Sequence, residues 1–129
     1  MKVLPEGETN DVEVQWEDQK RINTFSKLNS KLEEYEEQLK GFKTEKEYLD
    51  DVSMEMELVD EDEMVHYKIG DSFVQLPQSE VMERLEADVE KINKQVADKE
   101  SEVESITEEL EQLKKQLYAK FGHAINLER

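Results

Sequence analysis

The sequence has 129 residues, of which 40% are charged and 36% are hydrophobic, and its formal net charge is −17. This composition is too polar for a globule with a thick core, and it favours either a coiled coil or a disordered chain. The negative charge argues against nucleic acid and anionic membrane surfaces as partners, and the absence of cysteine excludes disulfides and thiolate metal sites.

The first twelve residues, which include Pro5 and Gly7, are expected to form a flexible tail. They lack the apolar core of a signal peptide, and no apolar run long enough to span a membrane follows, as expected of an intracellular protein. A helix is predicted over about residues 16–58. Apolar residues dominate its heptad a and d positions, which are Phe25, Leu28, Leu32, Tyr35, Leu39, Phe42, Lys46, Leu49, Ser53 and Met56. This alternating spacing of three and four indicates a coiled-coil seam and argues against disorder.

The periodicity changes after an acidic stretch at residues 57–63. Residues 64–76 are rich in Val, Tyr, Ile and Phe, with Gly70 and Asp71 in their middle. Gly at the first central position of a two-residue loop is typical of a type II′ turn, so the segment is predicted to form a β-hairpin. Pro77 is expected to end the second strand, because proline cannot donate to a ladder.

A second helix is predicted over about residues 79–121. Ser79 is its expected N-cap, while Lys120 and Gly122 are stop signals. Its seam positions are Met82, Leu85, Val89, Ile92, Val96, Lys99, Val103, Ile106, Leu110, Leu113, Leu117 and Lys120. Two similar seams joined by a hairpin predict a mainly α fold, in which a long antiparallel two-helix coiled coil carries the β-hairpin at one end and both termini at the other.

An isolated two-stranded hairpin is marginal in water, and its free edges recruit other strands. The predicted hairpin therefore favours oligomerisation through its apolar residues, which are Tyr67, Ile69, Phe73 and Val74. The alternative is a hairpin that folds back on its own helices.

Apolar residues also gather where the two helix ends are expected to converge. They are Trp16, Ile22, Tyr118, Phe121, Ile125 and Leu127. Those other than Ile22 and Tyr118 are expected to be exposed, whereas Phe25 and Leu117 occupy seam positions and are expected in the core. Exposed apolar groups at the end of a charged rod predict a binding surface, unless they cap the coiled coil against each other.

Three parts of the sequence resemble β-type subunits of the prefoldin family. They are WEDQKRINTF at residues 16–25, YKIGDSF at residues 67–73, and LYAKFG with INLE at residues 117–122 and 125–128. The last of these is the most specific, because a heptad pattern alone does not require it.

This resemblance implies a subunit of a heterohexameric co-chaperone with two α-type and four β-type subunits. Their hairpins would form a body of β-barrels, and the tips of their coiled coils would capture unfolded or nascent actin and tubulin. The client would pass to the cytosolic group II chaperonin without ATP. The resemblance also implies a cytoplasmic location, with nuclear roles known for some members. The apolar residues of the two helix ends would then bind clients, and those of the hairpin would assemble the subunits.

No sequence motif indicates an enzyme, a cofactor or a metal site. The acidic residues 60–63 are followed by Met64 and Val65 rather than by the ligands and glycine of a calcium loop. The two histidines, His66 and His123, are expected at opposite ends of the rod. The rival interpretation is a structural coiled-coil scaffold that binds no unfolded client, which would leave the hairpin and the apolar tip unexplained.

Overall fold

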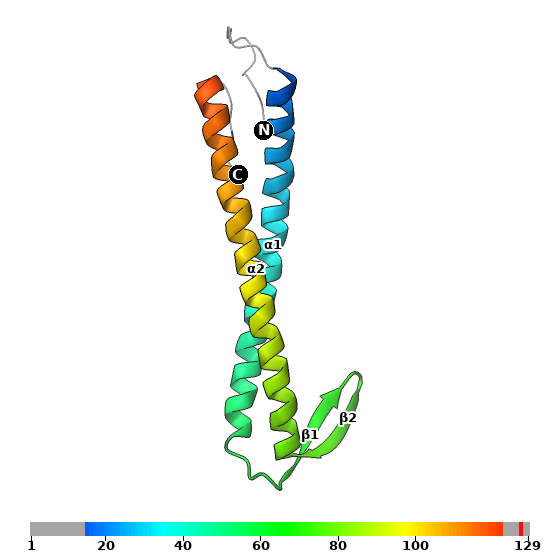
Figure 1. Cartoon of the computed structure of the whole chain (residues 1–129). Helices are drawn as coiled ribbons and strands as arrows, with labels where there is room; N and C mark the ends of the chain where they lie inside the picture. The colour runs from blue at the N-terminus through cyan, green and yellow to red at the C-terminus, as the bar shows by residue number, and fades with distance from the viewer. Residues whose placement is uncertain (1–14, 123–126, 128–129) are drawn as a thin grey trace. The chain divides into compact units, whose positions relative to one another are not determined.

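The computed structural model describes residues 15–122 and Leu127. Its elements are α1 (Trp16–Met56), β1 (Met64–Ile69), β2 (Ser72–Pro77) and α2 (Gln78–Phe121), as Figure 1 shows. The predicted mainly helical fold with one hairpin between two long helices is therefore confirmed. The predicted tail at residues 1–12, together with His123 and Ile125, lies outside the described residues.

The chain divides into two compact units. Unit 1 comprises Met1–Glu37 and Glu100–Arg129, and unit 2 comprises Gln38–Lys99. Each helix contributes a segment to both units, and within each unit the two segments run antiparallel (Figure 1). The hairpin belongs to unit 2.

The helices pack through the predicted seam. Every predicted a and d position of α1 is buried or half-buried, and so is every one of α2 except Lys120. The core of unit 1 is well covered and consists of Ile22, Phe25, Leu32, Ile106, Leu110, Leu117, Phe121 and Leu127. Each such side chain stabilises the fold by about 1.5–3 kcal/mol relative to exposure, so this unit has a substantial apolar core.

Unit 2 covers its own core less completely. Its buried apolar residues all come from α2, and they are Val81, Leu85, Ile92 and Val96. In the facing segment of α1, residues 38–56, the apolar residues are at best half-buried. The helix pair of unit 2 therefore leaves apolar surface that this chain does not cover.

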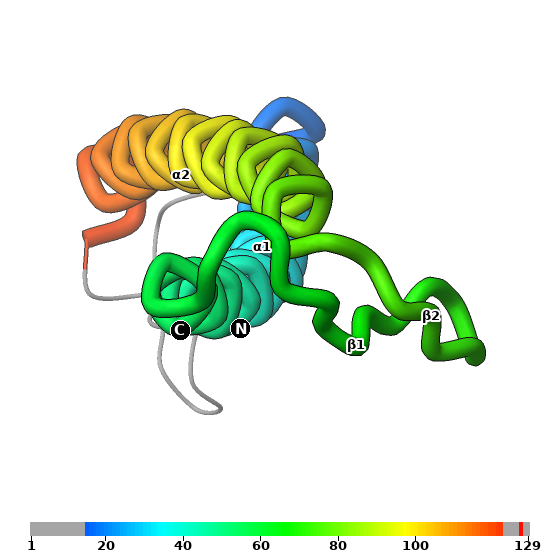
Figure 2. Tube along the Cα trace, turned by 90° about the horizontal axis from the view of Figure 1, so that it is seen from below, coloured from blue at the N-terminus to red at the C-terminus, as the bar shows by residue number. Residues whose placement is uncertain are grey.

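The hairpin has a regular antiparallel register. Its ladder runs from Met64 opposite Pro77 to Ile69 opposite Ser72, so Gly70 and Asp71 form a two-residue turn. Gly70 has a φ of 60°, the sign that a primed turn requires at its first central residue and that glycine adopts without strain. The hairpin leaves the helix pair of unit 2 to one side, as the view in Figure 2 shows.

Gln78 fixes the junction between the helices and the hairpin. It is buried, its backbone N–H donates to the Glu63 carbonyl at 2.8 Å, and its side-chain Nε2 donates to the Met56 carbonyl at 2.7 Å. The last carbonyls of a helix have no partner within the helix, and α1 has no basic residue in its last turn. One side chain therefore caps the end of α1 at the start of α2.

The boundaries differ from the prediction at this junction. The N-cap prediction for Ser79 is wrong, because α2 already begins at Gln78 and the Ser79 N–H donates to the Glu61 carbonyl at 3.3 Å. The backbone carbonyl of Glu61, in the acidic loop, thus accepts a hydrogen bond that an N-cap side chain would otherwise accept. Helix α1 ends at Met56 rather than at Leu58. At the other end of α2, Gly122 has a φ of 58°, as its predicted stop role requires.

Replacing Gln78 by Ala should lower the free energy of unfolding by about 1–2 kcal/mol, because the Met56 carbonyl loses its donor. Urea denaturation followed by circular dichroism measures this loss. Gln112→Ala, at an exposed position of α2, is the matched control and should change stability by less than about 0.5 kcal/mol. Equal losses in the two variants would contradict the capping role.

Candidate functional site

Large apolar side chains are exposed in both units. In unit 2 they are Tyr48, Met54, Leu58, Met64, Ile69 and Phe73, and in unit 1 they are Trp16 and Tyr118. Exposed apolar groups gathered on a highly charged chain indicate contact surfaces. Unit 2 and unit 1 therefore each carry a candidate surface.

The predicted assembly residues divide between the two faces of the hairpin and its tip. Tyr67 and Val74 lie opposite each other and are half-buried, whereas Phe73 is 69% exposed and Ile69, next to the turn, is 44% exposed. The Tyr67 hydroxyl donates a long hydrogen bond of 3.5 Å to Asp88 of α2. Burial, and then the Asp88 charge, raise the pKa of Tyr67, so the hydroxyl keeps its proton. The hairpin is thus anchored to its own helix by Tyr67 while Phe73 remains uncovered.

The hairpin also has free edges. In the described part of the chain its sheet contains only β1 and β2, so each strand has one side without a strand partner. Unpaired backbone donors and acceptors at such edges pair readily with further strands. The exposed Phe73 and these edges together suit association with other hairpins.

The second surface lies at the end of unit 1. Trp16 is 66% exposed at the first position of α1, with the Lys20 Nζ 5.2 Å from its ring centroid, and Tyr118 is 37% exposed near the end of α2. The side chains of Asp18 and Lys120 contact each other, and each lies two residues from one of these aromatic residues. Trp16 and Tyr118 therefore belong to the same end of unit 1.

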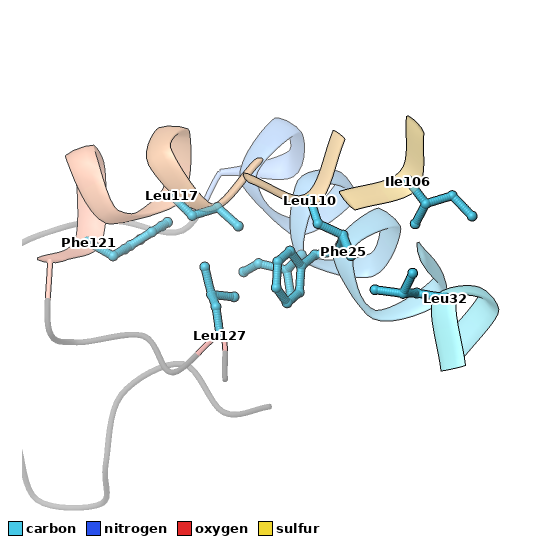
Figure 3. Packing of buried hydrophobic residues seen from close by; sticks show 8 residues of the cluster. Phe25, Leu32, Ile106, Leu110, Leu117, Phe121 and Leu127 are labelled. Atoms are coloured by element: carbon cyan, nitrogen blue, oxygen red, sulfur yellow. The ribbon is translucent and has the colours of Figure 1, made fainter. Parts of the chain in front are cut away.

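The predicted exposure of this end is wrong for two residues. Phe121 is 4% exposed and Leu127 is 1% exposed, and Ile22 is buried as well. They pack with Phe25 and Leu117, which are in the core as predicted (Figure 3). The apolar core of unit 1 extends beyond the last heptad position, because Leu127 covers side chains that would otherwise face water.

A buried carboxylate connects the two helices of unit 1. Asp18 is 2% exposed and is paired with Lys120 of α2 and, at 3.1 Å, with Arg21 of its own helix. It also accepts the Gln15 backbone N–H at 3.2 Å, as an acidic residue in the first helical turn does in a capping box. The hydrogen bond from Lys120 holds the pKa of Asp18 below its ordinary value, against the effect of burial.

Sequence reasoning missed Asp18 and Gln78. Asp18 is one of many acidic residues, and only its place in the first turn of α1 distinguishes it, a place that also suits a solvated helix end. The sequence places Lys120 at a seam position and among the stop signals of the second helix, and neither role indicates an ion pair with Asp18. Gln78 gave no signal, because its partner is a backbone carbonyl that any sequence supplies.

The described residues show no metal-binding or membrane-spanning feature. Within residues 15–122 and Leu127, no three His, Asp or Glu side chains gather as a metal site requires. Over their described length, neither α1 nor α2 is apolar enough to cross a membrane.

Comparison with known proteins identifies the family and the relatives of this chain. A profile of the family described as "Prefoldin subunit" matches residues 19–124. The chain belongs to the prefoldin family. Prefoldin subunit 4 of Saccharomyces cerevisiae is 47% identical over 129 residues and covers 100% of both chains. Human prefoldin subunit 4 is 39% identical over 126 residues, covering 97% of this chain and 94% of its own.

The fold is also that of a solved prefoldin subunit. The crystal structure of the prefoldin beta subunit from Thermococcus strain KS-1 matches with a TM-score of 0.77 at 15% identity, covering 85% of this chain and 96% of that one. The predicted membership of the prefoldin family is confirmed, and the fold is the one predicted for a β-type subunit. The chain is a subunit of the co-chaperone prefoldin, and prefoldin subunits form complexes with one another.

Replacing Asp18 of this prefoldin subunit by Asn should destabilise unit 1 at neutral pH. The stability of the variant should also change less than that of the wild type as the pH is lowered. The folded-state pKa of Asp18 lies below its ordinary value of 3.8, so the ionised carboxylate stabilises the fold above that pH. This contribution disappears as the pH falls through the folded-state pKa. The difference in unfolding free energy between wild type and Asp18→Asn should therefore shrink on acidification, as urea denaturation at a series of pH values would measure.

The matched control for Asp18→Asn is Asp50→Asn, at an exposed position of α1. This control should leave stability nearly unchanged at every pH. A stability difference between wild type and Asp18→Asn that stays constant from neutral to acidic pH would rule out the ion pair as its cause.

Proposed function

We propose that this subunit binds unfolded or nascent actin and tubulin through the end of unit 1, and that its complex delivers them to the cytosolic group II chaperonin. The observation that carries the proposal is the pair of exposed aromatic residues Trp16 and Tyr118 on the two helices of that end. Aromatic side chains offer a large apolar area at a small cost in conformational entropy, and they dominate contacts between proteins.

Capture works through many weak contacts. A single helix end buries little area, so one tip binds a client weakly, whereas several tips on one complex gain from high effective concentration. Weak single contacts also allow hand-over to the chaperonin without ATP or any catalytic step. The net charge of −17 opposes aggregation of the loaded complex.

Assembly uses the surface of unit 2. The proposed complex contains two α-type subunits and, beside this chain, three further β-type subunits in the cytoplasm. Phe73, Ile69 and the edges of the hairpin would join the hairpins of neighbouring subunits, with Tyr67 and Val74 holding the hairpin in place. The incompletely covered core of unit 2 supports this assignment, because association would bury the apolar side chains that the subunit leaves exposed.

Replacing both Trp16 and Tyr118 by Ser should weaken client capture at this tip about tenfold and leave the six-subunit complex intact. The chain has no cysteine, so Glu17→Cys, labelled with benzophenone before assembly, gives a single cross-linking site beside Trp16. The yield of cross-links to chemically unfolded actin measures capture, and native mass spectrometry checks the complex. Phe121 is not substituted, because its burial would confuse capture with stability.

The matched control for this tip is Tyr48→Ser. Tyr48 and Trp16 are both 66% exposed, but Tyr48 lies in unit 2. The control should keep the full yield of cross-links to actin per assembled complex, because Tyr48 belongs to the surface proposed for assembly and not to the tip. An unchanged yield in the Trp16 and Tyr118 double variant would refute the tip assignment.

Phe73→Ser should weaken incorporation of the chain into the six-subunit complex by about tenfold or more, because an exposed apolar anchor is lost. Native mass spectrometry of a mixture with the five other subunits measures the fraction incorporated. Lys68→Ser, at the position directly opposite Phe73 in the hairpin, is the control and should assemble as wild type does. Normal incorporation of the Phe73→Ser chain would show that the hairpin face is not an assembly surface.

A further inference from the structure

Unit 1 contains an apolar groove that the chain itself occupies. Leu127 is 1% exposed, and its side chain points between the two helices toward Phe25 and Leu117, with Phe121 close by (Figure 3). The walls come from both helices, since Phe25 lies on α1 and the other two residues lie on α2. The site that receives Leu127 is therefore a groove between two helix segments.

Leu127 does not fill this groove. Beside it lies a cavity of about 180 Å³. The residues that line it are Phe25, Asn29, Leu32, Thr107, Leu110, Glu111, Lys114 and Leu127. Apolar cavities of about 150 Å³ are large enough to take a benzene ring. The groove has apolar walls, a polar rim and room for a side chain larger than the leucine now in it.

The cavity lining also includes a polar atom without a partner. Asn29 lines the cavity, and its Oδ1 is buried with no hydrogen-bond donor among the described residues. A buried acceptor that stays unpaired has lost its hydrogen bonds to water without a replacement, which is unfavourable. The backbone N–H of an extended peptide would satisfy such an acceptor, which is what an unfolded client presents next to its apolar side chains.

We propose that the groove between the helices of unit 1 binds an aromatic or leucine side chain of an unfolded client, and that Leu127 is its resident competitor. This inference rests on the proposed function and assigns the client site a place inside the helix pair. Trp16 and Tyr118 make the outer contact, and the client side chain enters the groove when Leu127 leaves it.

Because Leu127 competes with the client for the groove, the client binds more weakly than it would bind to an empty groove. When a binding site is free for only a fraction of the time, the apparent dissociation constant is the intrinsic constant divided by that fraction. Removing the competitor should therefore strengthen binding at this tip. If Leu127 were instead a client contact, its removal would weaken binding, so the direction of the effect distinguishes the two roles.

The test uses the complete six-subunit complex with a benzophenone on Glu111→Cys, an exposed position at the groove. With chemically unfolded actin as the probe, Leu127→Ser should raise the yield of cross-links about threefold or more. Leu127→Met keeps an apolar competitor in the groove and should not raise the yield. Native mass spectrometry and helix content by circular dichroism confirm that each complex is folded.

A second measurement does not depend on the stability of the serine variant. In the Leu127→Met complex, a labelled methyl group at position 127 should shift to its solvent-exposed resonance when unfolded actin is added. A methyl resonance that does not move under saturating actin would overturn the proposal.

The failure of this inference differs from failure of the proposed function. If Leu127→Ser lowers or does not change the yield at Glu111→Cys while Glu17→Cys still captures actin, the groove is not the client site and the inference is overturned. If neither position captures actin, the proposed function fails and the inference fails with it.

Discussion

A pair of helices packed side by side buries one stripe of each helix, and the side chains at the ends of that stripe meet no further helix. In this chain each end is covered by a different means. Gln78 and the acidic loop satisfy the backbone where α1 passes into the hairpin. In unit 1 the paired charges of Asp18 and Lys120 connect the helices, and Leu127 covers the apolar side chains between them. The candidate surfaces lie where large apolar side chains remain exposed, as Trp16 does in unit 1 and Phe73 does in unit 2.

The seam was predictable because burial in a helix pair follows a period that the sequence displays directly. The hairpin was predictable for a similar reason, since Gly70 permits a backbone conformation that most residues avoid. The candidate surfaces were predictable only in outline. A heptad pattern locates the side chains that face the partner helix, but it does not say which residue beyond the last heptad returns to cover them. The burial of Phe121 and Leu127 depends on that return.

The missed polar contacts have a related cause. Asp18 and Lys120 are far apart in the sequence, and each has an ordinary local role as a charge that favours its own helix end. Gln78 binds a carbonyl that carries no sequence signal. Contacts of this kind become visible only in three dimensions. Knowledge of the prefoldin family gives the fold and the kind of complex, whereas it is the coordinates of this chain that separate the exposed aromatic residues from the buried ones.

The ion pair between Asp18 and Lys120 joins residues 102 positions apart. Ribosomes add about 5–20 residues per second, so roughly 5–20 s pass between the synthesis of the two partners. During this time the apolar stripe of α1 has been made while much of the helix that covers it has not. The newly made chain thus exposes apolar surface at that stage, as the proposed clients do. Its high density of negative charge is an advantage at that stage, because like charges keep such chains apart on a polysome.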